Sequence, residues 1–123
     1  MNETIDYMEA YNTFEKEFRL TQVSGEEIGA FIMKMTGFFI RYNVRYGDAI
    51  RAFSAIKAGF QSQIDVASGK TMSSAKAELL ADATPEAHMY EMARIHVTNL
   101  EQIINSMKSL QRGAMTEYSH ASL

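Results

Sequence analysis

The chain has 123 residues, of which 46% are hydrophobic and 22% are charged, and its formal net charge is −3. This length suits one modest hydrophobic core, so a single helical domain is predicted over residues 1–123. The negative charge gives no electrostatic reason to expect a nucleic-acid or membrane partner, and the absence of cysteine excludes disulfides, thiolate metal sites and a cysteine nucleophile.

The sequence shows neither a secretion signal nor a membrane-spanning segment. The first residues, MNETIDYMEA, are acidic and lack the basic flank and the apolar core of a secretion signal. No apolar run reaches the length of about 18 residues that a membrane-spanning helix needs. We therefore expect a cytoplasmic protein with no membrane partner.

Residues 3–20 predict a first amphipathic helix with an aromatic stripe. Tyr7, Tyr11, Phe14 and Phe18 follow one another at spacings of four, three and four, which places them on one helical face. A stripe of this kind is more typical of packing than of a cofactor surface.

A long helix is predicted from about residue 25 to residue 67. Ser24 followed by Glu27 is a capping-box pattern at its start. Two mostly apolar rows then recur every seven residues on one side of a continuous helix. The rows are Ile28, Met35, Tyr42, Ala49, Ile56 and Gln63, and Ile32, Phe39, Tyr46, Phe53, Phe60 and Ala67. The alternative is a break at Gly47, which would give a compact helical bundle instead.

A return arm is predicted over about residues 72–112, with an interruption at residues 82–84. Gly69 suits a left-handed end of the long helix, and Thr84 followed by Pro85 is a typical helix start. Gly113 is expected to end the last helix, so that residues 114–123 form a mobile tail.

These elements predict an all-α fold with no strand, built as an extended antiparallel helical hairpin with the 3–20 helix packed on its base. Phe31 and Phe38 widen the apolar face of the long helix near that base, and His96 is expected to face Tyr42 or Tyr46. Six tyrosines and seven phenylalanines are many for such a hairpin to bury. Self-association, most simply as a dimer, is therefore expected.

The sequence contains no motif that predicts a catalytic or a metal-binding site. His88 and Glu91 lie three residues apart, but a di-iron bundle needs the opposite order on two helices and further core carboxylates. No phosphate-binding glycine loop and no nucleophile elbow is present. We expect neither an enzyme nor a cofactor nor a metal.

A nucleic-acid interpretation rests on three arginines of the long helix. Arg41, Arg45 and Arg51 are interleaved with tyrosines, which would combine phosphate contacts with base stacking. They spread around the helix, however, so a solvated flank beside the apolar rows is the simpler interpretation. Nucleic-acid binding in recombination or replication remains the alternative function.

The segment from Tyr46 to Arg112 has a distinctive order of helical motifs. An aromatic and alanine-rich helix, YGDAIRAFSAI, precedes GKTMSSAKAE, and a tyrosine-containing helix, EAHMYEMARIHVTNLEQIINSMKSLQR, follows. This order resembles small helical proteins of unassigned role encoded in bacteriophage genomes. The resemblance implies an accessory role in the host-cell cytoplasm and carries over no catalytic residue.

The leading hypothesis is a non-enzymatic helical protein that acts by protein–protein interaction, as a phage-type accessory or assembly factor with a host or viral protein as partner. A secreted helical-hairpin effector is a third interpretation, but its Trp-x-Gly turn is impossible in a chain without tryptophan. The interaction candidates are Tyr7, Tyr11, Phe14, Phe18, Phe31, Phe38, Tyr42 and Tyr46, which would pack first and offer a partner whatever surface stays exposed.

Overall fold

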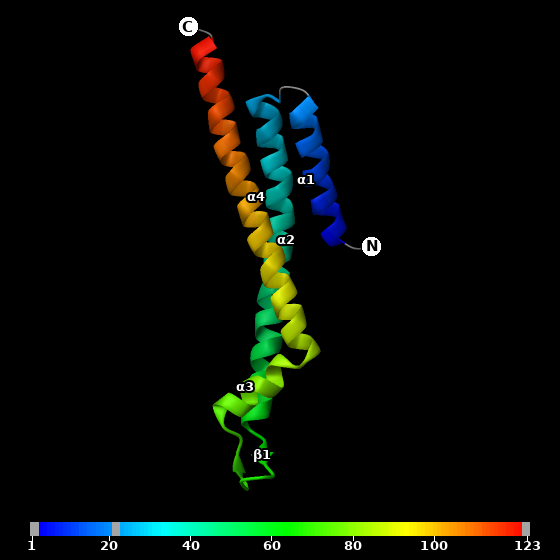
Figure 1. Cartoon of the computed structure of the whole chain (residues 1–123), viewed down its shortest axis with the longest axis vertical. Coiled ribbons are helices and arrows are strands. Elements are labelled where there is room, and N and C mark those ends of the chain that lie inside the picture. The colour runs from blue at the N-terminus through cyan, green and yellow to red at the C-terminus, as the bar shows by residue number, and fades with distance from the viewer. Residues whose placement is uncertain (1–2, 21–22, 122–123) are drawn as a thin grey trace. The chain divides into compact units, whose positions relative to one another are not determined.

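The structure is a computed structural model that describes residues 3–20 and 23–121, with side chains placed for residues 7–19 and 23–114. Helices account for nearly all of these residues, so the predicted all-α class is confirmed (Figure 1). The elements in chain order are α1 (Glu3–Leu20), α2 (Gly25–Gln61), β1 (Ile64–Asp65), β2 (Lys70–Thr71), α3 (Ser74–Asp82) and α4 (Pro85–Ala121).

Helix α2 begins where the sequence predicts and passes through Gly47 without a break. The Ser24 hydroxyl caps it, because its oxygen accepts the backbone N–H of Glu27 at 3.1 Å. The prediction that it extends to residue 67 is wrong, since α2 ends at Gln61. Beyond that point the apolar rows offer only Gln63 and Ala67, which have little apolar area to bury against a second helix.

The segment after α2 forms a short antiparallel hairpin, so the expectation of no strand is also wrong. Ile64 pairs with Thr71, and Asp65 pairs with Lys70. Gly69 takes the left-handed φ of 70° that glycine adopts at low cost, and its N–H donates to the Asp65 carbonyl at 2.7 Å. The left-handed residue therefore lies in the hairpin turn and not at the end of a helix.

The return arm starts twice, as expected, at two capped helices. Ser73 accepts the backbone N–H of Lys76 at 3.2 Å at the start of α3. Thr84 accepts the N–H of Ala87 at 3.3 Å at the start of α4. The predicted end near residue 112 is wrong, because α4 passes through Gly113, which a helix tolerates for about 1 kcal/mol. The predicted tail 114–123 is helical as far as Ala121, and its last two residues lie outside the described part of the chain.

The chain divides into two compact units, which are described separately. Unit 1 is Met1–Arg41 together with Thr98–Leu123, and unit 2 is Tyr42–Val97. Both contain parts of α2 and α4, and the predicted single domain stays a prediction.

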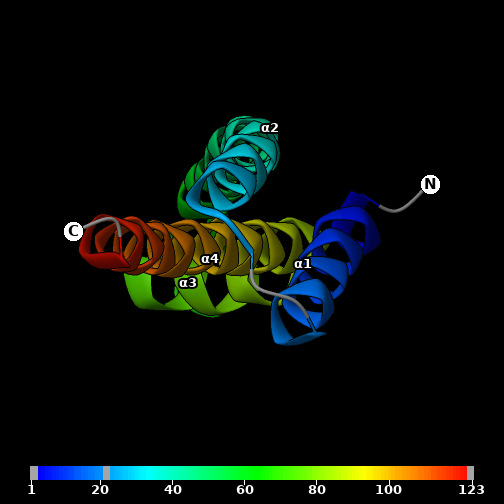
Figure 2. The same ribbon diagram turned by 90° about the horizontal axis from the view of Figure 1, so that it is seen from above.

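Unit 1 consists of α1, the first part of α2 and the last part of α4. The α2 segment runs opposite in direction to the other two (Figure 1), and seen from above the three segments do not lie in one plane (Figure 2). Apolar side chains from all three are buried between them. The buried residues are Tyr7, Phe14, Ile28, Phe31, Met35, Phe38, Leu100, Ile104 and Met107. The Gln111 amide also donates to the Gly25 carbonyl at 3.0 Å, which joins α4 to the start of α2.

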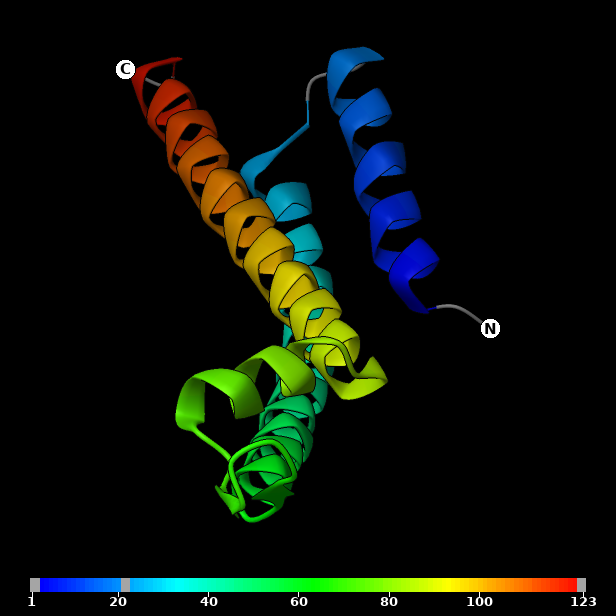
Figure 3. The same ribbon diagram turned by 60° about the horizontal axis from the view of Figure 1, so that its bottom comes forward.

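Unit 2 consists of the second part of α2, the hairpin, α3 and the start of α4 (Figure 3). Its buried side chains are Tyr42, Phe53, Ala77, Ala81 and Val97. An ion pair between Lys76 and Asp65, at 2.9 Å, joins α3 to the hairpin. The Lys76 ammonium, and after it the backbone N–H of Ala67, hold the pKa of Asp65 below its ordinary value.

This ion pair gives the hairpin a defined pH response. Because the folded-state pKa of Asp65 lies below the unfolded value of about 3.9, its carboxylate stabilises the hairpin above about pH 4, and this stabilisation is lost as the pH falls through the lowered pKa. Lys76→Met is expected to move the pKa of Asp65 up toward the ordinary value. A carboxyl-carbon NMR titration measures the shift, with Lys57→Met as the control that should leave it unchanged.

Candidate functional site

The aromatic candidates of α1 mostly pack inside unit 1. The Tyr7 ring lies against Phe38, with ring centroids 6.1 Å apart, and the Phe14 ring stacks on Phe31 at 4.1 Å. All four side chains are buried, so they fix α1 on α2 and leave little area for another protein. Phe18 differs, because 40% of its side chain is exposed.

The position of α1 selects which apolar row of α2 is buried in unit 1. Phe31 and Phe38 are buried, whereas Ile32 and Phe39, which belong to the predicted second row, are half-buried. The assignment of Ile32 and Phe39 as the main seam is therefore wrong for this part of α2. The reason is that α1 supplies the aromatic partners of Phe31 and Phe38.

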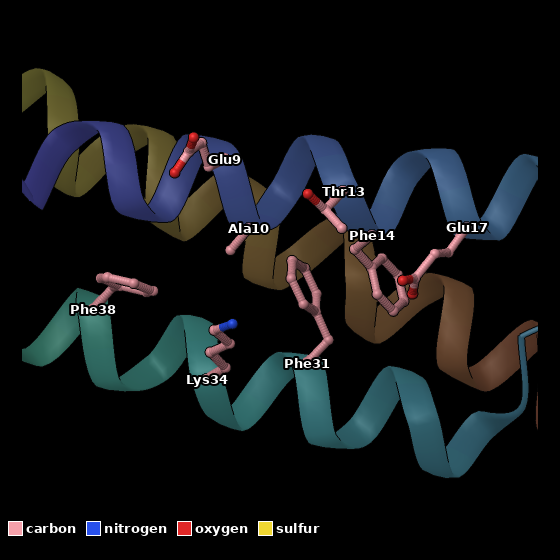
Figure 4. Close-up of a pocket in the computed structure, with 8 residues that line it drawn as sticks. All are labelled: Glu9, Ala10, Thr13, Phe14, Glu17, Phe31, Lys34 and Phe38. Atoms are coloured by element: carbon pink, nitrogen blue, oxygen red, sulfur yellow. The ribbon is translucent and has the colours of Figure 1, made fainter.

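A groove follows the line between α1 and α2 in unit 1 (Figure 4). Its volume is about 620 Å³. Three phenylalanines and one alanine provide the apolar part of the lining, and four polar side chains provide the rest. The lining residues are Ala10, Phe14, Phe31, Phe38, Glu9, Thr13, Glu17 and Lys34. In Figure 4 the Lys34 ammonium extends from α2 toward α1, and the Glu17 carboxylate extends from α1 toward α2.

A second surface of unit 1 is the outer face of α2, formed by Met33, Gly37 and Ile40. Spacings of four and three place these residues on one side of the helix. The side chain of Met33 is 76% exposed and that of Ile40 is 59% exposed. Met33 is two residues from buried Met35, about 200° around the helix, so this face points away from the core of unit 1.

The outer face of α2 carries no charged side chain between Met33 and Ile40. The nearest cations are Lys34, which lines the α1/α2 groove, and Arg41, whose guanidinium lies 4.8 Å from the centroid of the Phe38 ring. The Lys34 ammonium is therefore directed away from the outer face, whereas the Arg41 guanidinium lies at its edge, beside Gly37. Gly37 adds an open position, since a methyl group there would meet only the Arg41 guanidinium, at 3.9 Å.

The tyrosine candidates of α2 lie in unit 2 and pack against α4. The Tyr42 ring faces His96 with centroids 5.3 Å apart, and Tyr46 faces Tyr90 at 5.7 Å. Partial burial lowers the pKa of His96. The hydrogen bond with Tyr90 and then burial raise the pKa of Tyr46. These contacts make the tyrosines part of the packing between α2 and α4.

The three arginines of the nucleic-acid alternative each have a partner in their own helix. Arg41 lies over the Phe38 ring, as described above, and Arg45 lies over the Tyr42 ring at 5.2 Å. The Arg51 guanidinium forms an ion pair with Asp48.

Within residues 3–20 and 23–121, no group of three or more His, Asp or Glu side chains is arranged to hold a metal ion. None of the described helices is both long and apolar enough to cross a membrane.

The sequence interpretation missed the polar edge of the groove and the outer face of α2. Glu9, Thr13 and Glu17 are spaced by four, which is a signal for one helical face. Met33 and Ile40 are seven residues apart and opposite the seam, so the helix is apolar on two sides. A helix that is apolar on two sides needs a packing partner on each side, and the spacing of Met33 and Ile40 in the sequence already indicates the second apolar side.

Comparisons with protein-family models, with curated proteins and with solved structures return no match for this chain.

Proposed function

We propose that this chain is a non-enzymatic helical protein that acts by protein–protein interaction, and that it associates with a second copy through the outer face of α2. One observation carries the proposal: Met33 and Ile40 are 76% and 59% exposed on one face of α2, with Gly37 between them. When two such apolar side chains on each copy are covered, the burial favours the free energy of association by roughly 25 cal/mol for each Å² of apolar area removed from water.

Gly37 supports a helix-on-helix contact at this face. Glycine in a helix interior costs roughly 0.5–1 kcal/mol relative to alanine, and no neighbouring element of unit 1 requires a glycine at this position. The absence of a side chain allows a second helix to approach closely between Met33 and Ile40. In a symmetric dimer the outer face of one copy packs against the outer face of the other, so the same surface is buried on both copies.

The arrangement of α2 and α4 along their whole length is part of the same proposal. We infer that α2 and α4 form an extended antiparallel hairpin, supported within unit 1 by the contact of Gly25 with Gln111 and within unit 2 by that of Tyr42 with His96. The resemblance of the segment from Tyr46 to Arg112 to phage-encoded helical proteins supports an accessory or assembly role, with a host or viral protein as a further partner.

Replacement of Gly37 by alanine separates folding from association. The thermal unfolding temperature of the monomer is expected to rise, because alanine removes the helix cost of glycine. The dimer dissociation constant is expected to increase, because the added methyl group lies where the second helix approaches. Sedimentation measures the dissociation constant, and the frictional ratio from the same runs tests the hairpin.

Gly59→Ala is the matched control on the same helix, since nothing lies within 4 Å of a methyl group at that position. It is expected to leave the dissociation constant unchanged. Equal effects of the two substitutions on association would contradict the assignment of the outer face as the contact.

A further inference from the structure

The outer face of α2 has charged residues of opposite sign near its two ends. Glu26 is seven residues before Met33, about two helical turns, so it lies in line with Met33 and Ile40 beyond the N-terminal end of the face. Its carboxylate is exposed and takes part in no hydrogen bond or ion pair within the described part of the chain. Arg41 lies at the other end, where its guanidinium is beside Gly37. The face is therefore acidic before its start and basic at its end.

Between these two charges the surface of α2 consists of apolar and small residues. Ala30 and Gly37 are also seven residues apart and lie beside the line of Met33 and Ile40, and Ala30 is exposed. An alanine and a glycine on this side allow the backbone of a second helix to approach more closely than larger side chains would. Lys34 does not interrupt the surface, because its ammonium extends toward α1 (Figure 4).

The order of the charges distinguishes the two ways in which a second copy can pack on this face. In a parallel pair each residue lies opposite itself, so Glu26 faces Glu26, Arg41 faces Arg41, and like charges repel. In an antiparallel pair the two ends are exchanged, so each Glu26 approaches Arg41 of the second copy. A two-fold axis midway between Ala30 and Gly37 is also midway between Glu26 and Arg41. One antiparallel arrangement therefore places the small residues opposite one another and brings the opposite charges together.

We propose that two copies of the chain pair antiparallel along α2, so that Glu26 of each copy forms an ion pair with Arg41 of the other. This inference rests on the proposed association through the outer face of α2 and adds its orientation. Ala30 of one copy lies opposite Gly37 of the other, and the Met33 side chains lie close to the two-fold axis. The two ion pairs, about 22 Å apart along the helix axis, flank the apolar contact and set its register.

The surroundings of Arg41 suit this role. Its guanidinium lies 4.8 Å from the centroid of the Phe38 ring in its own chain. A guanidinium that stacks on an aromatic ring keeps the N–H donors in its own plane accessible to a carboxylate, so both contacts are compatible. Phe38 therefore positions Arg41 before the second copy binds, which reduces the conformational entropy lost on association.

Charge reversal tests the orientation. In the antiparallel pair, Glu26→Lys places two cations together at each end of the contact, and Arg41→Glu places two carboxylates together there. Each single variant is expected to increase the dimer dissociation constant of the full chain by at least about tenfold, because two attractive contacts become repulsive. The double variant Glu26→Lys with Arg41→Glu restores opposite charges at both ends. Its dissociation constant, measured by sedimentation equilibrium, is expected to return to within about threefold of that of the unmodified chain.

The matched controls are Glu101→Lys and Lys108→Glu, which make the same charge changes at exposed positions of α4. Each is expected to leave the dissociation constant within about twofold of that of the unmodified chain. Circular dichroism checks that every variant keeps its helix content. If the control variants weaken association as much as Glu26→Lys and Arg41→Glu do, the effect is due to net charge and the proposed ion pairs are wrong.

The outcomes separate the orientation from the association on which it rests. In a parallel dimer like charges face each other before and after each single reversal, so the single variants would bind as tightly as the unmodified chain. That result, with the unmodified chain still dimeric, would overturn the antiparallel pairing alone. Failure of the double variant to regain affinity would overturn the pairing of Glu26 with Arg41. A mass of one chain at every concentration of the unmodified protein would instead contradict the association itself.

Discussion

Met35→Ala is expected to lower the free energy of unfolding by about 2–5 kcal/mol, which is a large part of the stability of a small helical domain. The Met35 side chain is fully buried at the centre of the α2 segment of unit 1, where side chains of α1 and α4 are buried too. Its removal takes away apolar contacts and leaves a cavity that a three-helix core closes only in part. Chemical denaturation followed by circular dichroism at 222 nm measures the loss.

The matched control for Met35 is the same residue type two positions earlier on the same helix. Met33 is 76% exposed, so Met33→Ala is expected to change the free energy of unfolding by no more than about 0.5 kcal/mol. Both variants are measured at concentrations where the chain is monomeric, because Met33 belongs to the proposed dimer contact. Equal losses for the two variants would mean that the phase of α2 is assigned incorrectly.

Phe14→Ala is expected to release α1 from α2. The Phe14 ring stacks on Phe31 at 4.1 Å and also lines the α1/α2 groove. Truncation of a buried phenylalanine costs about 3–5 kcal/mol, and the Phe14–Phe31 stack is one of two aromatic pairs that join α1 to α2 among the residues with described side chains. We expect the amide protons of α1 to lose their protection from hydrogen exchange.

Phe18→Ala controls for a general loss of aromatic area from α1. Its side chain is 40% exposed, so the expected loss of unfolding free energy is below about 1 kcal/mol, and exchange protection in α1 is retained. Similar loss of protection in both variants would contradict the role of the Phe14–Phe31 stack in holding α1.

Helix starts were predictable from the sequence because each depends on a local hydrogen bond. Ser24 and Thr84 both accept a backbone N–H three residues later, and the sequence pattern predicts a helix start at each of them. The aromatic stripe of α1 and the contact of Tyr42 with His96 follow from helical phase, which is also local information.

Helix ends and the burial of particular rows were less predictable because they depend on tertiary contacts. Gln61 ends α2 where a hairpin supplies other backbone partners, and Gly113 fails to end α4 although glycine often does so. Phe31 is buried in preference to Ile32 only because α1 packs on that side. The α1/α2 groove likewise exists only once two helices are placed side by side.

Sedimentation equilibrium of the unmodified chain over a dilution series tests the central claim most directly. The weight-average mass is expected to rise from that of one chain at low concentration toward that of two chains at high concentration. Met33→Glu, which places a charge on the outer face of α2, is expected to hold the mass at one chain throughout. A mass of one chain at every concentration of the unmodified protein would contradict association through this face.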